Sequence, residues 1–240
     1  MYLKWQEKTI ADFSEQNIND LYDHGFLFTR VGKGAMYQTR SVRIDLDKFE
    51  LSSENRRVLR KIENVAMETT PIPYSNYSWE IGKLGKNFYE QKFGEGIFSA
   101  NKIKELLTNK EKSNFNLLLV YNVIARSNSD EAISSPTGRS PRPDGARDDS
   151  QPAGYSICYS NAKILHYSYP FYNLQNSTSN IGIGMMTRAI EYAKKEKRKY
   201  VYLGSAKDNA ALYKFQFAGV EWFDGKIWQS DIEKLKNTLK

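Results

Sequence analysis

Short stretches of this 240-residue chain alternate apolar and polar residues, and this period of two predicts β-strands. A nearly continuous apolar run at 115–125 predicts a strand that is covered on both faces. Residues 200–203 predict another short buried strand, which Gly204 ends. Strand pairs are expected around three turns: Gly32-Lys33-Gly34 between 25–30 and 35–46, Ser160-Asn161 between 154–160 and 162–169, and Asp224-Gly225 between 220–223 and 226–228.

Other stretches repeat apolar residues at helical spacing. One helix is expected to begin at Ser52 or Ser53, with Arg56 and Arg57 on a basic face. Its expected buried face is Val58, Leu59, Ile62, Val65 and Ala66. Further helices are expected near residues 19–24, 81–88, 99–107, 183–193, 213–217 and 231–239. This order of elements predicts an α/β (α+β) fold with a mixed sheet and helices on both faces.

The segment 127–153 differs in composition from the rest of the chain. It is dense in Ser, Pro, Asp, Gly and Arg, and Ile133 is its one branched aliphatic residue. Such a segment cannot offset its ordering entropy by burial, so it is expected to be a disordered loop. Because the strands after it need those before it as neighbours, we expect one fold built from residues 1–126 and 154–240.

The net charge of the chain is +7, and it is unevenly distributed. Residues 127–153 hold five acidic residues and three arginines, so the remainder carries +9. A body this basic favours polyanionic partners, although a solvated lysine-rich surface explains the same composition.

Several classes of protein are disfavoured by the sequence. No apolar run approaches the roughly 20 residues that span a bilayer, and the first residues are charged. We therefore expect a cytoplasmic protein without a membrane partner. The single Cys158 excludes internal disulfides, and His24 and His166 stand far apart, so no metal is expected.

The stretch 177–217 carries the candidate chemistry. Its first helix opens at Gly182-x-Gly184, where unpaired backbone N–H groups can bind an anion such as a phosphate. The next strand carries Tyr202, and the helix after it carries Tyr213. A transferase for an activated acyl group can be built from these parts, although a lone Gly-x-Gly also serves close helix packing and a helical tyrosine is often a core residue.

Five motifs, in this order, resemble the aminoacyl-tRNA–protein transferases of the N-end rule pathway, within the GNAT acyltransferase superfamily. They are Asp23-His24-Gly25-Phe26, Arg43-x-Asp45-Leu46-x-x-Phe49-x-x-Ser52-x-x-Asn55-Arg56-Arg57, Tyr169-Pro170-Phe171-Tyr172-Asn173-Leu174, Tyr200-Val201-Tyr202-Leu203-Gly204 and Tyr213-Lys214-x-x-Phe217. The closest likeness within that pathway is to the arginyl- and leucyl-transferring enzymes. The resemblance covers roughly residues 20–67 and 154–228.

The resemblance implies a GNAT-like fold and transfer of an amino acid from a charged tRNA to a protein N-terminus, as in protein arginylation. The charged tRNA would be a co-substrate, and no further cofactor is implied. The implied roles are catalysis by Tyr213 and Tyr202, donor binding by Asn180, Gly182, Ile183, Gly184 and Lys214, RNA binding by Arg43, Arg56 and Arg57, and acceptor binding by Asp45 and Tyr172.

Three features depart from that family pattern. The N-terminal cysteine cluster is replaced by Gly32-Lys33-Gly34-Ala35-Met36, the segment between Gly204 and Tyr213 is short, and Gly182-x-Gly184 approaches the pyrophosphate loop of CoA-dependent enzymes. Two alternatives therefore stay open, a CoA-dependent N-acyltransferase and a non-catalytic binder of RNA or peptide. The sequence leaves the oligomeric state open, with a monomer favoured.

Overall fold

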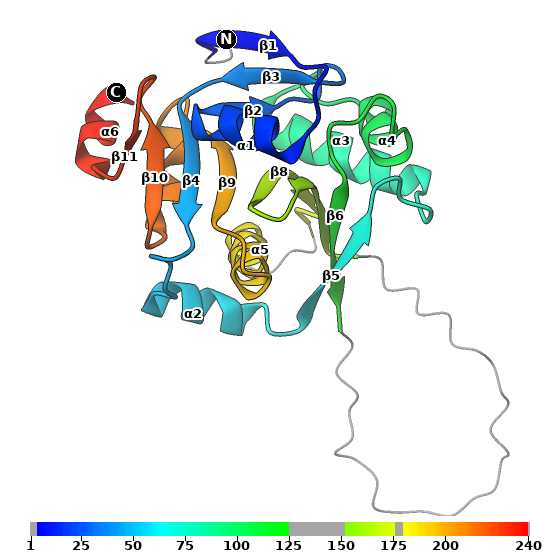
Figure 1. The fold of residues 1–240 in the computed structure, drawn as a ribbon. Helices are drawn as coiled ribbons and strands as arrows, with labels where there is room; N and C mark the ends of the chain where they lie inside the picture. Colours follow the sequence, from blue (N-terminus) through cyan, green and yellow to red (C-terminus); the bar gives the residue numbers. More distant parts are fainter. Residues whose placement is uncertain (1–3, 125–151, 176–179, 240) are drawn as a thin grey trace, which may run out of the picture.

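The computed structural model describes residues 4–124, 152–175 and 180–239 (Figure 1). Most of the segment expected to be a disordered loop, 127–153, lies outside the described residues. The elements follow in the order β1 (Gln6–Thr9), α1 (Glu15–Asp23), β2 (Phe26–Phe28), β3 (Ala35–Gln38), β4 (Ser41–Asp45), α2 (Ser53–Lys61), β5 (Val65–Pro71), α3 (Trp79–Phe93), α4 (Ala100–Thr108), β6 (Leu117–Val123), β7 (Gly154–Ser160), β8 (Ile164–Tyr172), α5 (Ile181–Lys195), β9 (Tyr200–Ser205), the 3-10 helix η1 (Asn209–Gln216), β10 (Val220–Phe223), β11 (Trp228–Gln229) and α6 (Ile232–Thr238).

A large sheet organises the molecule, with the strand order β11-β10-β4-β9-β8-β7-β6-β5. Its strands pair antiparallel except β8 and β9, which run parallel and are joined through α5. β1, β3 and β2 form a second, smaller sheet. The predicted mixed sheet is therefore confirmed.

Helices cover both faces of the large sheet, as the sequence predicts (Figure 1). On one face, α5 buries Met185, Ala189 and Ile190 against the sheet, and α2 packs beside α5. On the other face, α1, α3 and α4 enclose a second apolar cluster. β9 shows the alternation that feeds both clusters, since Val201 and Leu203 face α5 whereas Tyr200 and Tyr202 face the opposite side.

Several local predictions are confirmed. Ser52 caps α2, and its hydroxyl and the side chain of Asn55 form a reciprocal capping box. The three strand pairs expected from their turns form as β2–β3, β7–β8 and β10–β11. Residues 115–125 contain the apolar strand β6, which pairs with β5 and β7.

Other local predictions are wrong. The single strand expected at 35–46 is two strands in different sheets, because the chain turns at Thr39 and Arg40, where the Ser41 hydroxyl donates to the Gly25 carbonyl oxygen at 2.6 Å. Val65 and Ala66 belong to β5 rather than to the preceding helix. β1 was missed because all four of its residues are exposed and show no alternating apolar pattern.

Candidate functional site

β8 and β9 separate partway along their length, and this separation defines the candidate site. They pair from Ile164 and Tyr200 to His166 and Tyr202. Beyond that point β8 continues beside β7, while β9 continues beside β4 as far as Ser205. We call residues 167–172 and 203–205 the strand fork. Their facing backbone edges do not pair with each other, which leaves main-chain donors and acceptors for a ligand.

A β-bulge lies on one arm of the strand fork. Ile157 of β7 pairs with Tyr169 and Cys158 pairs with Tyr167, so Ser168 of β8 is an extra residue. A bulge bends its strand and increases the local twist. It therefore accounts for the departure of β8 from β9.

The N-terminus of α5 follows β8 on the face that carries Val201 and Leu203. Asn180 precedes the helix in a left-handed conformation with φ of 73°, and among the described residues no side chain caps the first turn. The Gly184 N–H donates to the Asn180 carbonyl oxygen at 2.9 Å, so the N–H groups of Ile181, Gly182 and Ile183 precede the first intrahelical hydrogen bond. These amides and the helix dipole favour an anion.

The two glycines of the predicted phosphate loop face different neighbours. A Cβ on Gly184 would lie 2.4 Å from Cδ1 of Ile62, so this glycine permits close packing of α5 against the chain that follows α2. A Cβ on Gly182 would instead lie 2.7 Å from the Tyr172 hydroxyl. Only Gly182 therefore faces a polar group of the strand fork.

Tyr213 lies on η1 and is 45% exposed. Surrounding protein atoms still raise the pKa of its hydroxyl to about 12, and Tyr172 adds to this shift. At neutral pH the Tyr213 hydroxyl is therefore protonated and can donate a proton. Since Tyr172 also contacts Gly182, the two phenols and the first turn of α5 form one neighbourhood.

Lys214, the next residue, is buried and lies close to the β9 arm of the strand fork. Its Nζ donates to the Ser205 carbonyl oxygen at 2.7 Å, and its charge helps burial to lower the pKa of His166 on β8. Burial lowers the pKa of Lys214 to about 8, and no ion pair joins it to a carboxylate in the described part of the chain. This ammonium can polarise a carbonyl group or bind an anion.

The other tyrosine predicted to be catalytic lies on the opposite face of the sheet. Tyr202 is fully buried, and its hydroxyl donates to Oδ1 of Asp23 at 3.4 Å. Burial raises its pKa well above the ordinary value. Because Tyr213 is on the α5 side, the structure does not bring these two tyrosines together.

Arg43, predicted to bind RNA, is an internal cation. Its guanidinium lies 3.9 Å from the ring centroids of both Tyr200 and Trp228. It also forms ion pairs with Asp23 at 3.2 Å and Glu221 at 2.9 Å. These four contacts occupy the side chain and tie β4 to its neighbours.

The remaining predicted residues lie near α2 and the end of β4. Arg56 is exposed and donates to the Leu51 carbonyl oxygen at 2.6 Å, whereas Arg57 forms a bidentate pair with Glu54. Asp45 is buried and pairs with Lys48 at 3.1 Å. None of these contacts reaches the strand fork.

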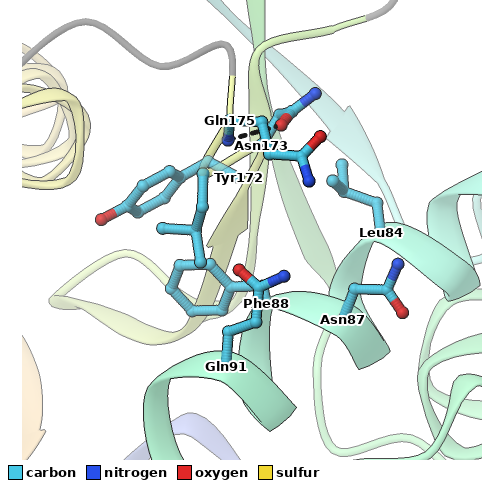
Figure 2. Close-up of a pocket in the computed structure, with 8 residues that line it drawn as sticks. Leu84, Asn87, Phe88, Gln91, Tyr172, Asn173 and Gln175 are labelled. Atoms are coloured by element: carbon cyan, nitrogen blue, oxygen red, sulfur yellow. Dashed lines mark hydrogen bonds between the residues drawn. The ribbon is translucent and has the colours of Figure 1, made fainter.

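A cavity of about 160 Å³ lies beside the strand fork, between α3 and the end of β8 (Figure 2). Its lining combines four carboxamide residues with apolar ones, and consists of Leu84, Asn87, Phe88, Gln91, Tyr172, Asn173, Leu174 and Gln175. The Tyr172 ring packs 4.7 Å from that of Phe88, and Figure 2 shows its hydroxyl pointing away from the cavity. Sequence reasoning missed this cavity, although Asn87 and Gln91 at helical spacing were a usable signal.

Within the described residues, no group of three or more His, Cys, Asp or Glu residues could hold a metal ion. The helices of the same part of the chain include none that is both long and apolar enough to cross a bilayer. Cys158 is free and buried, which raises its thiol pKa to about 12. A thiol with that pKa is a poor nucleophile.

No protein-family model matches the chain, and no curated protein matches it. Among solved structures, it is similar to L-PGS from Bacillus licheniformis, with 12% identity, a TM-score of 0.43, and coverage of 80% of this chain and 52% of that one. It is also similar to the C-terminal domain (DUF2156) of a protein described as a lysylphosphatidylglycerol synthetase from Agrobacterium fabrum. The identity is 11%, the TM-score is 0.44, and the match covers 80% of this chain and 52% of that one. A third similar structure is a GCN5-related glucosamine N-acetyltransferase region of a fungal β-N-acetylglucosaminidase. The identity is 10%, the TM-score is 0.45, and the match covers 89% of this chain and 23% of that one.

The chain therefore spans about half the length of the first two of these structures. Likenesses this distant do not assign an activity to this chain.

Proposed function

We propose that this protein is a GNAT-like acyltransferase that moves an amino acid from a charged tRNA to the N-terminal α-amine of a protein. The observation that carries the proposal is the strand fork, which opens next to the first turn of α5 and the side chains of Tyr213 and Lys214. The choice of donor and acceptor is supported by the sequence motifs and by the basic charge of the chain.

In the proposed reaction, the protonated acceptor amine first gives one proton to solvent, which frees the lone pair of its nitrogen. Its nitrogen then attacks the ester carbonyl carbon of the charged tRNA, and the carbonyl oxygen takes up the displaced electron pair. Lys214 stabilises this negative charge, and preorganised donors of this kind typically accelerate acyl transfer strongly. The intermediate collapses when the oxygen re-forms the carbonyl and the bond from carbon to the ribose oxygen breaks, and the attacking nitrogen releases its extra proton to solvent.

Tyr213 donates its proton to that leaving ribose oxygen. Its raised pKa keeps the proton in place at neutral pH, and exposure lets solvent restore it afterwards. The first turn of α5 holds a phosphate of the donor, while the arms of the strand fork orient the ester. Tyr202 and Arg43 have no chemical role in this proposal, because they lie in the core on the other face.

A CoA-dependent N-acyltransferase is the second candidate. The first turn of α5 favours it, because a diphosphate suits the N–H groups of Ile181, Gly182 and Ile183. In that reaction Tyr213 would protonate the leaving thiolate instead.

The test incubates the protein with charged tRNAs or with acetyl-CoA, together with peptides that differ in their first residue, and detects added mass. We expect an aminoacyl addition at the peptide N-terminus that depends on charged tRNA. The Tyr213→Phe variant should transfer about 10²- to 10⁴-fold more slowly, as expected for loss of a general acid. Tyr37→Phe is the matched control, because it removes the same hydroxyl from a tyrosine on β3 of the smaller sheet, and it should keep full activity.

Acetyl addition without aminoacyl addition would replace the proposal with the second candidate. If neither donor gives a product, or if Tyr213→Phe is as active as Tyr37→Phe, the proposed chemistry is wrong.

A further inference from the structure

A second, larger cavity of about 400 Å³ lies between α3 and the start of α4. Its lining is aromatic, basic and amide-bearing, and consists of Tyr77, Trp79, Lys83, Lys86, Asn87, Ala100, Asn101 and Lys104. We call it the α3–α4 groove. It is separate from the strand fork and supplies no chemical group to the proposed reaction.

Two glycines build this groove by letting the helices approach. A Cβ on Gly82 would lie 2.5 Å from the Tyr77 hydroxyl and 3.3 Å from the Ala100 carbonyl oxygen. A Cβ on Gly85 would lie 2.5 Å from Cδ1 of Ile103 on α4. The close contact brings the side chains of both helices to the rims of one groove.

Trp79 supplies an open aromatic surface. It is 65% exposed, although tryptophan usually buries most of its surface. Lys83 lies one turn further along α3, with its Nζ 5.3 Å from the Trp79 ring centroid. This position leaves most of the indole accessible to a second planar group.

Lysines line both rims of the groove. Lys83 and Lys86 come from α3 and Lys104 comes from α4, and all three are exposed. Lys86 pairs with Glu90 at 3.3 Å, while no ion pair holds Lys83 or Lys104 within the described residues. The groove therefore presents positive charge around an aromatic surface.

We propose that the α3–α4 groove binds a single-stranded nucleic acid, with one base stacked on Trp79 and neighbouring phosphates on Lys83 and Lys104. Stacking on an aromatic side chain within a basic groove is the usual way to hold unpaired bases. Asn87 and Asn101 provide amides for base edges. An anionic membrane surface fits less well, because the indole lines a concave groove rather than a protruding apolar face.

The groove also adjoins the first cavity. Asn87 lines both cavities, and Tyr172 of the first one reaches Gly182 of α5. If the donor of the proposed function is a charged tRNA, its single-stranded 3′ end is the segment expected here. The binding itself does not require the proposed reaction.

Fluorescence anisotropy with a labelled 12-nucleotide RNA, measured at several salt concentrations, tests the proposal. Trp79→Ala should weaken binding about 5- to 150-fold, the range for loss of one stacked base. Lys83→Glu should weaken binding and reduce the slope of log K against log salt by about 0.7, as for one lost phosphate contact on a single strand.

Matched controls sit outside the groove. Phe93→Ala removes an aromatic residue that is 62% exposed at the other end of α3, and Lys195→Glu reverses an exposed charge at the end of α5. Both controls should bind the RNA like the unmodified protein. A duplex of the same composition should bind more weakly than the single strand.

The proposal is overturned if Trp79→Ala and Lys83→Glu bind like these controls, or if duplex and single strand bind equally. It is also overturned if phosphatidylglycerol vesicles, and not RNA, bind in a Trp79-dependent way. Tyr213→Phe separates the two proposals, because it should leave RNA binding unchanged. RNA binding without transfer by any variant would refute the proposed function alone.

Discussion

Substitution of the two glycines of α5 tests whether the Gly-x-Gly pattern binds a ligand or packs a helix. Gly184→Ala places a Cβ 2.4 Å from Cδ1 and 2.9 Å from Cγ1 of Ile62, a residue that is fully buried. Overpacking of this kind costs about 1–3 kcal/mol. The better helix propensity of alanine offsets about 1 kcal/mol of this cost. We therefore expect the free energy of unfolding to fall by up to about 2 kcal/mol. At this chain length each kcal/mol lowers the unfolding midpoint by roughly 2–4 °C.

Gly182→Ala should behave differently, because its new Cβ meets the end of a side chain. The end of the Tyr172 ring, with its hydroxyl at 2.7 Å and Cε1 and Cζ at 3.1 Å, has to shift, and the helix propensity gain of about 1 kcal/mol should offset this cost and leave stability nearly unchanged. The displaced hydroxyl should instead weaken donor binding. Adding Tyr172→Phe removes the clashing oxygen, and this double variant should bind donor better than Gly182→Ala alone.

Thermal unfolding and the KM for the donor, measured on all three variants, check this reasoning. We expect Gly184→Ala to change stability with little change in KM, and Gly182→Ala to raise KM with little change in stability. The opposite pattern would show that the structural assignment of the two glycines is wrong.

Three further predictions concern the charged and phenolic groups. Burial lowers the pKa of Lys214 from 10.5 to about 8, so Lys214→Met should raise the free energy of unfolding at pH 7 by about 1–3 kcal/mol. This gain should shrink as pH rises from 8 to 10.5. Urea unfolding at several pH values measures it, and a gain that stays constant would contradict the lowered pKa. Arg43→Met should cost about 1.5–3 kcal/mol, because Asp23 and Glu221 lose their charged hydrogen bonds to Arg43 but keep Lys163 and Lys48 as partners; equilibrium unfolding measures this loss, and unchanged stability would contradict the internal role of Arg43. Since the pKa of Tyr213 is about 12, the transfer rate should show no fall from phenol ionisation up to pH 10, and a fall that Tyr213→Phe abolishes would refute its raised pKa.

Much of the fold could be predicted because local signals agreed with the tertiary structure. The capping residue Ser52, the turn Asp224-Gly225 and the apolar run of β6 each specify structure within a few neighbours. Where long-range contacts determine the secondary structure, local sequence patterns gave a wrong prediction. Val65 continues the apolar spacing of α2, yet it pairs with Val123 as the first residue of β5.

The candidate site was predictable only in part, for a related reason. The positions of Gly182, Tyr213 and Lys214 follow from a motif, and the structure gathers them around the strand fork. The separation of β8 from β9 depends on which strands pair with β7 and β4, and no local pattern encodes that.

The two faces of β9 show most clearly what local sequence patterns could not predict. Tyr202 alternates with Val201 and Leu203, so strand geometry places it opposite α5. Recognising this required knowing which face α5 covers. The α3–α4 groove could not be predicted either, because Trp79 and Lys104 line one cavity only when the two helices pack together.

Hydrogen exchange with and without donor tests most directly whether the strand fork is the donor site. Charged tRNA should slow exchange of the amides at residues 181–183 and 203–205, whereas acetyl-CoA, added in a separate run, should do so only if the second candidate function is correct. Amides of β10 and α6 should be unaffected. Protection confined to other elements while either donor is bound would contradict the account.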